Sequence, residues 1–124
     1  MLIDPDALFE DAVLSQIIEY LRHEQARGRV VWFERSNGGG GRVGARWVWF
    51  FRLYLLGKEP VSNGKADIVG MLPGGRFFAL EVKQRGKKAT ADQREYLDAV
   101  AAGGGIAATV RSFQDAKREL FGEG

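Results

Sequence analysis

Residues 66–84 constrain the fold more strongly than any other stretch of the sequence. Two short runs rich in apolar and β-branched residues flank a Pro-Gly-Gly turn at positions 73–75. Proline and glycine supply the backbone angles of a tight turn, so this pattern is typical of a β-hairpin. We therefore predict strands at 66–72 and 76–84. A single pairing at the turn then sets the register of the whole hairpin.

Helices are predicted on both sides of this hairpin in the sequence. The Asp-Pro pair at 4–5 suits the cap and first turn of a helix that runs to about Gln25. A second helix spans 90–102, where Thr90 and Gln93 have the spacing of a capping box. The first helix carries an apolar stripe at helical spacing, formed by Val13, Leu14, Ile17 and Leu21.

The segment between the first helix and the hairpin has an uneven composition. Residues 29–35 are rich in β-branched and aromatic side chains and predict a strand. The four consecutive glycines at 38–41 stabilise no regular element, so we predict a loop at 37–44. The aromatic-rich segment 45–56 favours a strand, and 57–64 predicts another loop.

The C-terminal part completes a single α/β domain. A strand is predicted at 105–112, and Ser112 caps a last helix that ends near Phe121. The order is then α-β-(β)-β-β-α-β-α, which indicates one α/β domain over residues 1–124 with a mixed sheet flanked by helices. A chain of 124 residues suits one such domain.

The hairpin register places two acids face to face. With Leu72 opposite Arg76, Asp67 lies directly opposite Glu81. Facing residues share one side of a sheet, with Cβ atoms roughly 4.5–5.5 Å apart. Lys83, two residues beyond Glu81, projects from the same side, roughly 7 Å along the strand. The sequence therefore predicts two carboxylates and an ammonium at one place.

A divalent cation would explain this arrangement, because like charges that face each other destabilise a sheet. The sequence has no cysteine and one histidine, His23, which we expect at the surface. A metal would be held by oxygen, which favours Mg²⁺ or Mn²⁺. Such a cation can activate water and neutralise a phosphate. Lys83 could stabilise the attacking hydroxide or the phosphate oxygens.

Two further groups of residues have a functional and a structural interpretation. Glu10 falls on the apolar stripe of the first helix and is either a third metal-site acid or an exposed first-turn acid. The basic residues on connecting segments either contact phosphate groups or are simply solvated; these are Arg42, Arg46, Arg85, Lys87 and Lys88. The net charge of +2 does not decide between these readings.

The aromatic residues of 45–56 exceed what a small core needs. Trp47, Trp49, Phe50 and Phe51 either cover the back of the sheet or form a subunit contact, and we favour the subunit contact. The longest apolar stretch, 47–56, is interrupted by Arg52 and is too short to span a bilayer. The acidic N-terminus does not have the pattern of a signal peptide. We therefore expect a cytoplasmic protein without a membrane partner.

Asp67 followed by Glu81-Val82-Lys83 on the next strand resembles the Asp…(Asp/Glu)-x-Lys motif of the PD-(D/E)xK nuclease superfamily. More narrowly, the chain resembles the stand-alone VRR-NUC domains found in phage proteins, a domain that also occurs in the Fanconi-associated nuclease. The similar segments lie in the same order along most of the chain: the helix around Glu10, residues 64–70, residues 72–76, Glu81-Val82-Lys83 and the Gln93 helix. One departure is Ala66, where the family usually has proline before the aspartate.

This resemblance implies a restriction-endonuclease-like α-β-β-β-α-β core and an Mg²⁺- or Mn²⁺-dependent endonuclease that hydrolyses phosphodiester bonds. It also implies a structure-selective enzyme, a homodimer that resolves four-way (Holliday) junctions in branched DNA. Lys83 would be catalytic and Gln93 would line the site, although the capping box also accounts for Gln93. The implied metal ligands are Glu10, Asp67, Glu81 and the carbonyl of Val82.

Two other functions remain open at this point. One is a nickase or exonuclease that acts on ordinary duplex or single-stranded DNA. The other is a DNA-binding or assembly module that has the fold without the activity. The presence of Asp67, Glu81 and Lys83 together argues against the non-catalytic module.

Overall fold

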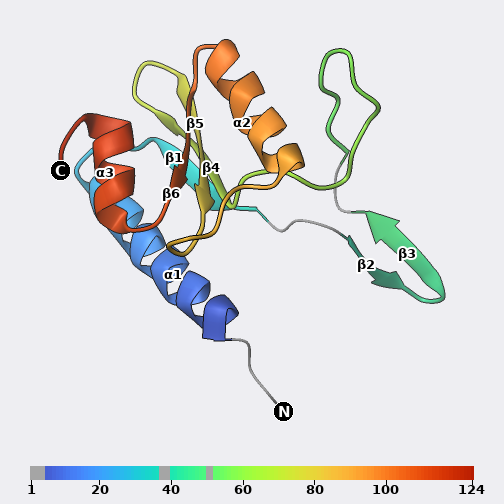
Figure 1. Ribbon diagram of the computed structural model, residues 1–124. Coiled ribbons are helices and arrows are strands. Elements are labelled where there is room, and N and C mark those ends of the chain that lie inside the picture. Colours follow the sequence, from blue (N-terminus) through green and yellow to red (C-terminus); the bar gives the residue numbers. More distant parts are fainter. Residues whose placement is uncertain (1–4, 37–39, 50–51) are drawn as a thin grey trace.

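The structure, a computed structural model, describes residues 5–36, 40–49 and 52–124. It confirms an α/β architecture (Figure 1). The elements in chain order are α1 (Pro5–Ala26), β1 (Trp32–Arg35), β2 (Gly40–Val43), β3 (Arg46–Trp49), β4 (Ile68–Leu72), β5 (Arg76–Val82), α2 (Ala91–Ala102), β6 (Ile106–Val110) and α3 (Phe113–Phe121). No helix in these ranges is long and apolar enough to cross a membrane.

The central sheet has four strands in the order β1-β4-β5-β6. The two pairs β1–β4 and β4–β5 are antiparallel, and β5–β6 is parallel, so the sheet is mixed as predicted. The β4–β5 hairpin has the predicted register, with Leu72 opposite Arg76. Gly74 and Gly75 both have positive φ angles, of 90° and 85°, which explains why this turn needs glycine.

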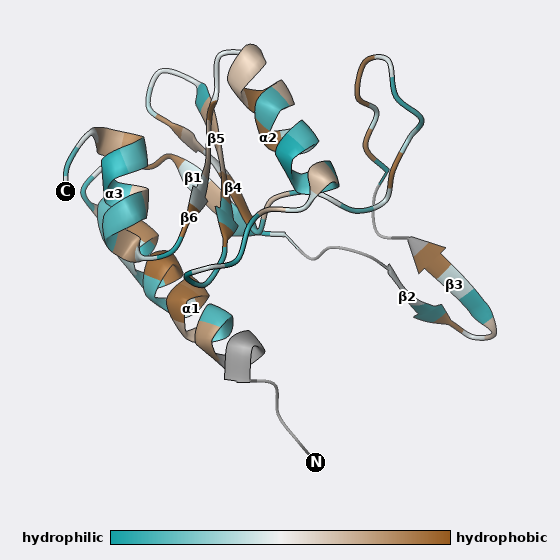
Figure 2. Ribbon diagram, viewed as in Figure 1, coloured by the Kyte–Doolittle hydropathy of each residue, from teal (hydrophilic) through white to brown (hydrophobic). Residues whose placement is uncertain are grey.

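The two faces of the sheet pack against different helices (Figures 1 and 2). Alternate residues of the strands, among them Ile68, Phe78 and Leu80, form one core cluster with α1 and α3. The intervening residues, among them Val69 and Ala79, pack against α2. The predicted stripe of α1 is buried in the first cluster. This alternation decides which helix each side chain of the hairpin meets.

Both predicted helix caps of the C-terminal half are present. The Thr90 side chain accepts a hydrogen bond from the N–H of Gln93, and the Gln93 side chain accepts one from the N–H of Thr90. Ser112 caps α3 in the same way, because its side chain accepts from the N–H of Asp115. These caps fix where both helices begin.

The predicted loop at 37–44 is wrong for residues 40–43. These residues form β2, which pairs antiparallel with β3. Glycine is required there, since a Cβ on Gly40 would lie 2.4 Å from the carbonyl oxygen of Val48 and 2.7 Å from Nε1 of Trp47. The glycine backbone therefore allows close packing that a side chain would prevent. Residues 37–39 lie outside the described part of the chain.

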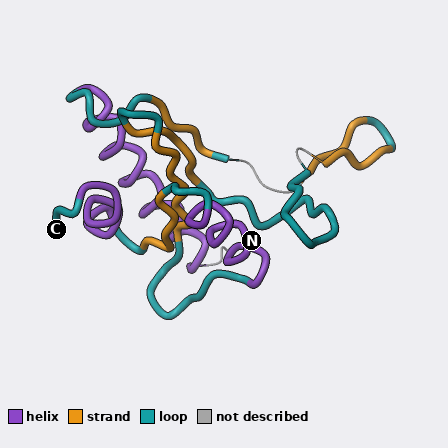
Figure 3. The backbone as a smooth tube through the Cα atoms, turned by 90° about the horizontal axis from the view of Figure 1, so that it is seen from above, coloured by secondary structure: helices purple, strands orange, loops and turns teal. Residues whose placement is uncertain are grey.

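Other strands are shorter than predicted. The strand expected at 29–35 starts at Trp32, because residue 29 still belongs to the turn after α1, where its N–H donates to the carbonyl of Glu24. Of the strand expected at 45–56, only β3 is regular, and beyond residues 50–51, which are not described, Leu53 makes an isolated bridge to Val61. Figures 1 and 3 show the β2–β3 hairpin projecting away from the four-stranded sheet.

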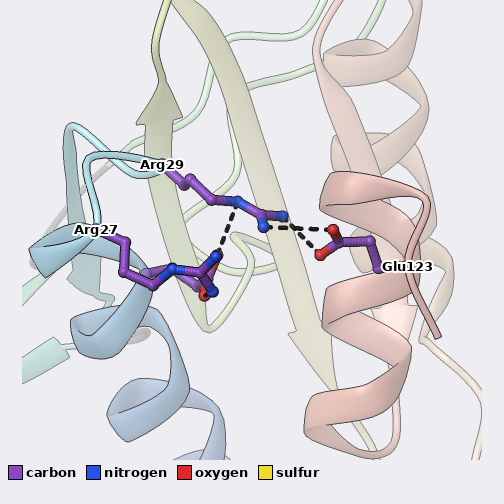
Figure 4. A network of polar contacts seen from close by, with 4 residues as sticks. Arg27, Arg29 and Glu123 are labelled. Atoms are coloured by element: carbon purple, nitrogen blue, oxygen red, sulfur yellow. Dashed lines mark hydrogen bonds and ion pairs between the residues drawn. The ribbon is translucent and has the colours of Figure 1, made fainter.

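An ion-pair network around the buried Glu24, at the end of α1, was not predicted from the sequence (Figure 4). The Glu24 side chain is only 2% exposed. Its two oxygens lie 2.9 Å from Nη1 of Arg27 and 2.9 Å from Nε of Arg29. Arg29 also contacts Glu123 at 2.7 Å and stacks on Phe121. The network therefore connects the end of α1 to the chain after α3.

Candidate active site

The structure confirms that Asp67 and Glu81 face each other across the β4–β5 hairpin. Ile68 pairs with Leu80, and the same register carries one step further to Asp67 and Glu81. Asp67 directly precedes β4, and its Oδ2 accepts a hydrogen bond of 2.8 Å from the N–H of Val82. The carboxylate thereby occupies the position that a backbone carbonyl would take in a longer ladder.

Glu81 is a buried acid with one oxygen engaged and one without a partner. Only 3% of the surface of Glu81 is exposed to solvent. Oε1 accepts a hydrogen bond of 2.8 Å from Nε2 of Gln93 and lies 3.8 Å from Nζ of Lys83. Oε2 is buried and has no hydrogen-bond partner among the described residues. When Glu81 is ionised, this buried oxygen has no hydrogen bond to satisfy it and is open to a cation.

The surroundings of Glu81 favour its protonated form. Burial raises the pKa of Glu81 to about 8, and the negative charge of the facing Asp67 acts in the same direction. The charge of Lys83 opposes this shift without cancelling it. Near neutral pH the pair therefore holds a proton that a bound cation would displace.

Gln93 serves the helix cap and the acid pair at the same time. Its Oε1 accepts the N–H of Thr90, which directs its Nε2 donor toward Glu81. A glutamate at this position could complete the cap equally well but could not donate to Glu81. The two readings left open for Gln93 therefore describe one arrangement, in which the cap orients the amide that holds Glu81.

The structure does not bring Glu10 into this group. Glu10 is half-buried on α1, which packs against the opposite face of the sheet from α2. In the described part of the chain, no three acids or histidines lie close enough to hold a metal together. The roles of Glu10 and of the Val82 carbonyl as metal ligands remain predictions.

The predicted basic residues are all exposed and lie in two places. Arg85, Lys87 and Lys88 follow β5 in the connector to α2. Nη2 of Arg111 donates to the carbonyl of Lys87 at 2.7 Å and holds this connector against the end of β6. Arg42 and Arg46 lie on the projecting β2–β3 hairpin, and His23 is exposed as predicted.

One neighbour of the acid pair was missed by the sequence analysis. Ser36 follows β1, and its N–H donates to the carbonyl of Asp67 at 2.7 Å. The sequence predicted the strand before Ser36 but contained no signal for which strand it would pair with.

A pocket of about 550 Å³ lies elsewhere, between residues 55–58 and α2, and does not include the acid pair.

The donor set of Asp67 and Glu81 fits a hard divalent cation. Both groups offer oxygen, they face each other, and one oxygen of Glu81 has no hydrogen bond to any residue that the structure describes. Neither a comparison of the chain with protein-family models nor a search of curated protein sequences gives a match. The interpretation of this site therefore depends on its geometry and chemistry.

We predict that Glu81 makes the metal-free protein less stable as pH rises. The folded protein keeps the Glu81 proton up to about pH 8, whereas the unfolded chain loses it near the ordinary pKa of 4.5. Between these values the folded state binds more protons, so the free energy of unfolding falls with increasing pH. Glu81→Gln should remove this part of the slope. Denaturant unfolding in a chelating buffer across this range measures it, and identical slopes for the two proteins would contradict the raised pKa.

Proposed function

We propose that the protein is a metal-dependent nuclease that hydrolyses phosphodiester bonds in DNA, with its active site at Asp67, Glu81 and Lys83. The observation that carries this proposal is the pair of facing carboxylates beside an ammonium, in which Glu81 is buried and one of its oxygens has no hydrogen-bond partner among the described residues. A buried acid that faces a second acid destabilises a sheet, and a cation-dependent reaction gives a reason for keeping the two together.

Each side chain has a distinct task in this proposal. Asp67 and Glu81 would hold Mg²⁺ or Mn²⁺, which when bound supplies activation of water and neutralisation of phosphate charge. The Lys83 ammonium, 3.8 Å from Oε1 of Glu81, would stabilise the charge that develops on the reacting phosphate. Gln93 keeps Glu81 in one orientation through its hydrogen bond to Oε1. The Val82 N–H does the same for Asp67.

The order of the elements supports a restriction-endonuclease-like core. With the β2–β3 hairpin regarded as an insertion, the remaining order from α1 to β6 is α-β-β-β-α-β. Glu81 lies on one of the two central strands of this core, Asp67 directly precedes the other, and Gln93 lies on the helix that follows. This is the arrangement that the resemblance to VRR-NUC nucleases implies, and it supports assigning the chain to that group.

DNA is the substrate class that suits the surface beside the acid pair. The connector that leaves β5 carries Arg85, Lys87 and Lys88, all exposed, within a few residues of Lys83. Lysine and arginine on a segment of this kind contact phosphates and position the duplex. The connector therefore gives the nucleic-acid backbone a path next to the proposed reaction centre.

The proposal also includes a more specific claim, that the protein is a homodimer and acts on branched DNA. Large apolar side chains lie exposed on the β2–β3 hairpin and on the loop after it; these are Val43, Trp47, Val48, Tyr54 and Leu56. Figure 2 shows hydrophobic residues along this projecting region. Such a surface suits a second copy of the chain. A two-fold dimer would supply the two cuts that a four-way junction requires.

Alternatives with the same active site differ in substrate. A nickase or exonuclease would need only one site and no dimer, whereas a non-catalytic DNA-binding module would need neither the acid pair nor Lys83. The buried Glu81 facing Asp67 favours a catalytic protein over a binding module. Comparing a four-way junction with a linear duplex of matched sequence distinguishes the two catalytic alternatives.

We predict that Asp67→Ala and Glu81→Ala abolish Mg²⁺-dependent cleavage of DNA without loss of fold. Each substitution loses one hydrogen bond, from the Val82 N–H or from Gln93, and relieves the cost of holding two acids together, so the metal-free variants should remain folded. Lys83→Ala should keep Mg²⁺ binding and lose about 10²–10³ in cleavage rate, as is typical for the loss of one group that stabilises transition-state charge. Gel-based cleavage assays and calorimetric Mg²⁺ titrations provide both readouts.

Glu19→Ala is a matched control, because Glu19 is an exposed acid on α1. It should cleave like the wild type. Near-normal cleavage by either acid variant at equal Mg²⁺ would place the active site elsewhere. Loss of Mg²⁺ binding in Lys83→Ala with intact cleavage would reverse the roles assigned to these residues.

We predict that the wild type is a dimer in solution and that Trp47→Glu with Tyr54→Glu makes it a folded monomer. Trp47 is 55% exposed and Tyr54 is 77% exposed, so charge at these positions should disturb a subunit contact rather than the core. Val31→Glu is the control, since Val31 is 52% exposed and lies next to β1. Light scattering measures the mass, and a monomeric wild type that cuts junctions symmetrically would exclude the dimer.

A further inference from the structure

Ser36 lies in line with the acid pair across three strands of the sheet. Arg35 is the partner of Ile68, and the next pair in that register is Ser36 and Asp67. The hydrogen bond from the N–H of Ser36 to the carbonyl of Asp67 shows that the pairing continues to this position. Because Asp67 in turn faces Glu81, the three residues form one row on the face of the sheet that packs against α2.

The hydroxyl of Ser36 is buried and makes no hydrogen bond to any described residue. Buried hydroxyls are nearly always paired, because removing one from water without a partner is unfavourable. The unpartnered Oε2 of Glu81 belongs to the same row. Two orphaned oxygens, one on each side of Asp67, indicate that a ligand completes the row.

The chemistry of the row indicates what Ser36 would contact. Asp67 and Glu81 as carboxylates can only accept hydrogen bonds, and a cation between them satisfies such oxygens. A hydroxyl can also donate, and the nonbridging oxygens of a phosphodiester are strong acceptors. Lys83 already offers a donor on the Glu81 side of the row. Ser36 offers one on the Asp67 side.

We propose that Ser36 is a substrate-binding residue whose hydroxyl donates a hydrogen bond to a nonbridging oxygen of the phosphodiester held at the acid pair. This inference rests on the proposed nuclease function, since it takes the substrate phosphate from it. It adds a donor that lies outside the Asp67, Glu81 and Lys83 set. Ser36 and Lys83 would then hold the phosphate from opposite sides of the acid pair.

The test compares Ser36→Ala, which removes the hydroxyl, with Ser36→Thr, which keeps it. Ser36→Ala should lower kcat/KM for DNA cleavage by about ten-fold or more, because a hydrogen bond to a charged group is lost. Its affinity for Mg²⁺ should not change, and its melting temperature should equal or exceed that of the wild type, because the Ser36 hydroxyl makes no hydrogen bond to a described residue that the substitution would remove. Ser36→Thr should retain most of the activity. Ser15→Ala, at an exposed serine on α1, is the control.

The outcomes separate this inference from the proposed function. Wild-type cleavage with an unimpaired Ser36→Ala variant would overturn the role of Ser36 and leave the nuclease assignment in place. Equal loss in Ser36→Ala and Ser36→Thr, or a lower melting temperature in Ser36→Ala, would show a packing role and overturn the proposal. A wild type that cleaves neither junction nor linear DNA with Mg²⁺ or Mn²⁺ would overturn the nuclease function and the substrate role of Ser36 together.

Discussion

The register of the β4–β5 hairpin is the constraint on which the candidate site depends. Two glycines with positive φ angles close the turn, and the turn decides that Asp67 stands opposite Glu81. A shift by one residue would move Glu81 to the α1 face, among the apolar side chains of the larger core cluster. The hydrogen bond from the Val82 N–H to Asp67 secures the pairing at the end of the ladder, where the strand itself has stopped.

The acid pair is unfavourable for folding of the metal-free protein. Hydrogen bonds from the Val82 N–H and from Gln93 hold the two side chains in place. Burial and the facing charge raise the pKa of Glu81, so the folded chain stabilises its protonated form. The capping box of α2 orients Gln93, which donates to one oxygen of Glu81, while the other oxygen has no hydrogen-bond partner in the described part of the chain. The Gln93 side chain that caps α2 therefore also orients the Glu81 carboxyl group at the proposed metal site.

Local sequence signals predicted those parts of the fold that local chemistry determines. The Pro-Gly-Gly turn, the stripe of α1 and the caps at Thr90 and Ser112 were all confirmed. Features that depend on distant partners could not be predicted. Glu24 continues the α1 stripe at helical spacing, but its partner Arg29 lies in the turn after the helix and Glu123 at the other end of the chain. The β2 strand depends on how Trp47 packs over Gly40, and the place of Ser36 depends on which strand accepts β1.

The most direct test of the central claim is the number of protons released when Mg²⁺ binds. Calorimetric titration in buffers of different ionisation enthalpy gives this number. If the cation binds at Asp67 and Glu81, about one proton should be released below pH 8, because Glu81 must lose its proton, and release should vanish at higher pH. Glu81→Gln should abolish both the binding and the release. Mg²⁺ binding without proton release, or binding that Glu81→Gln leaves unchanged, would contradict the assignment of this pair as the metal site.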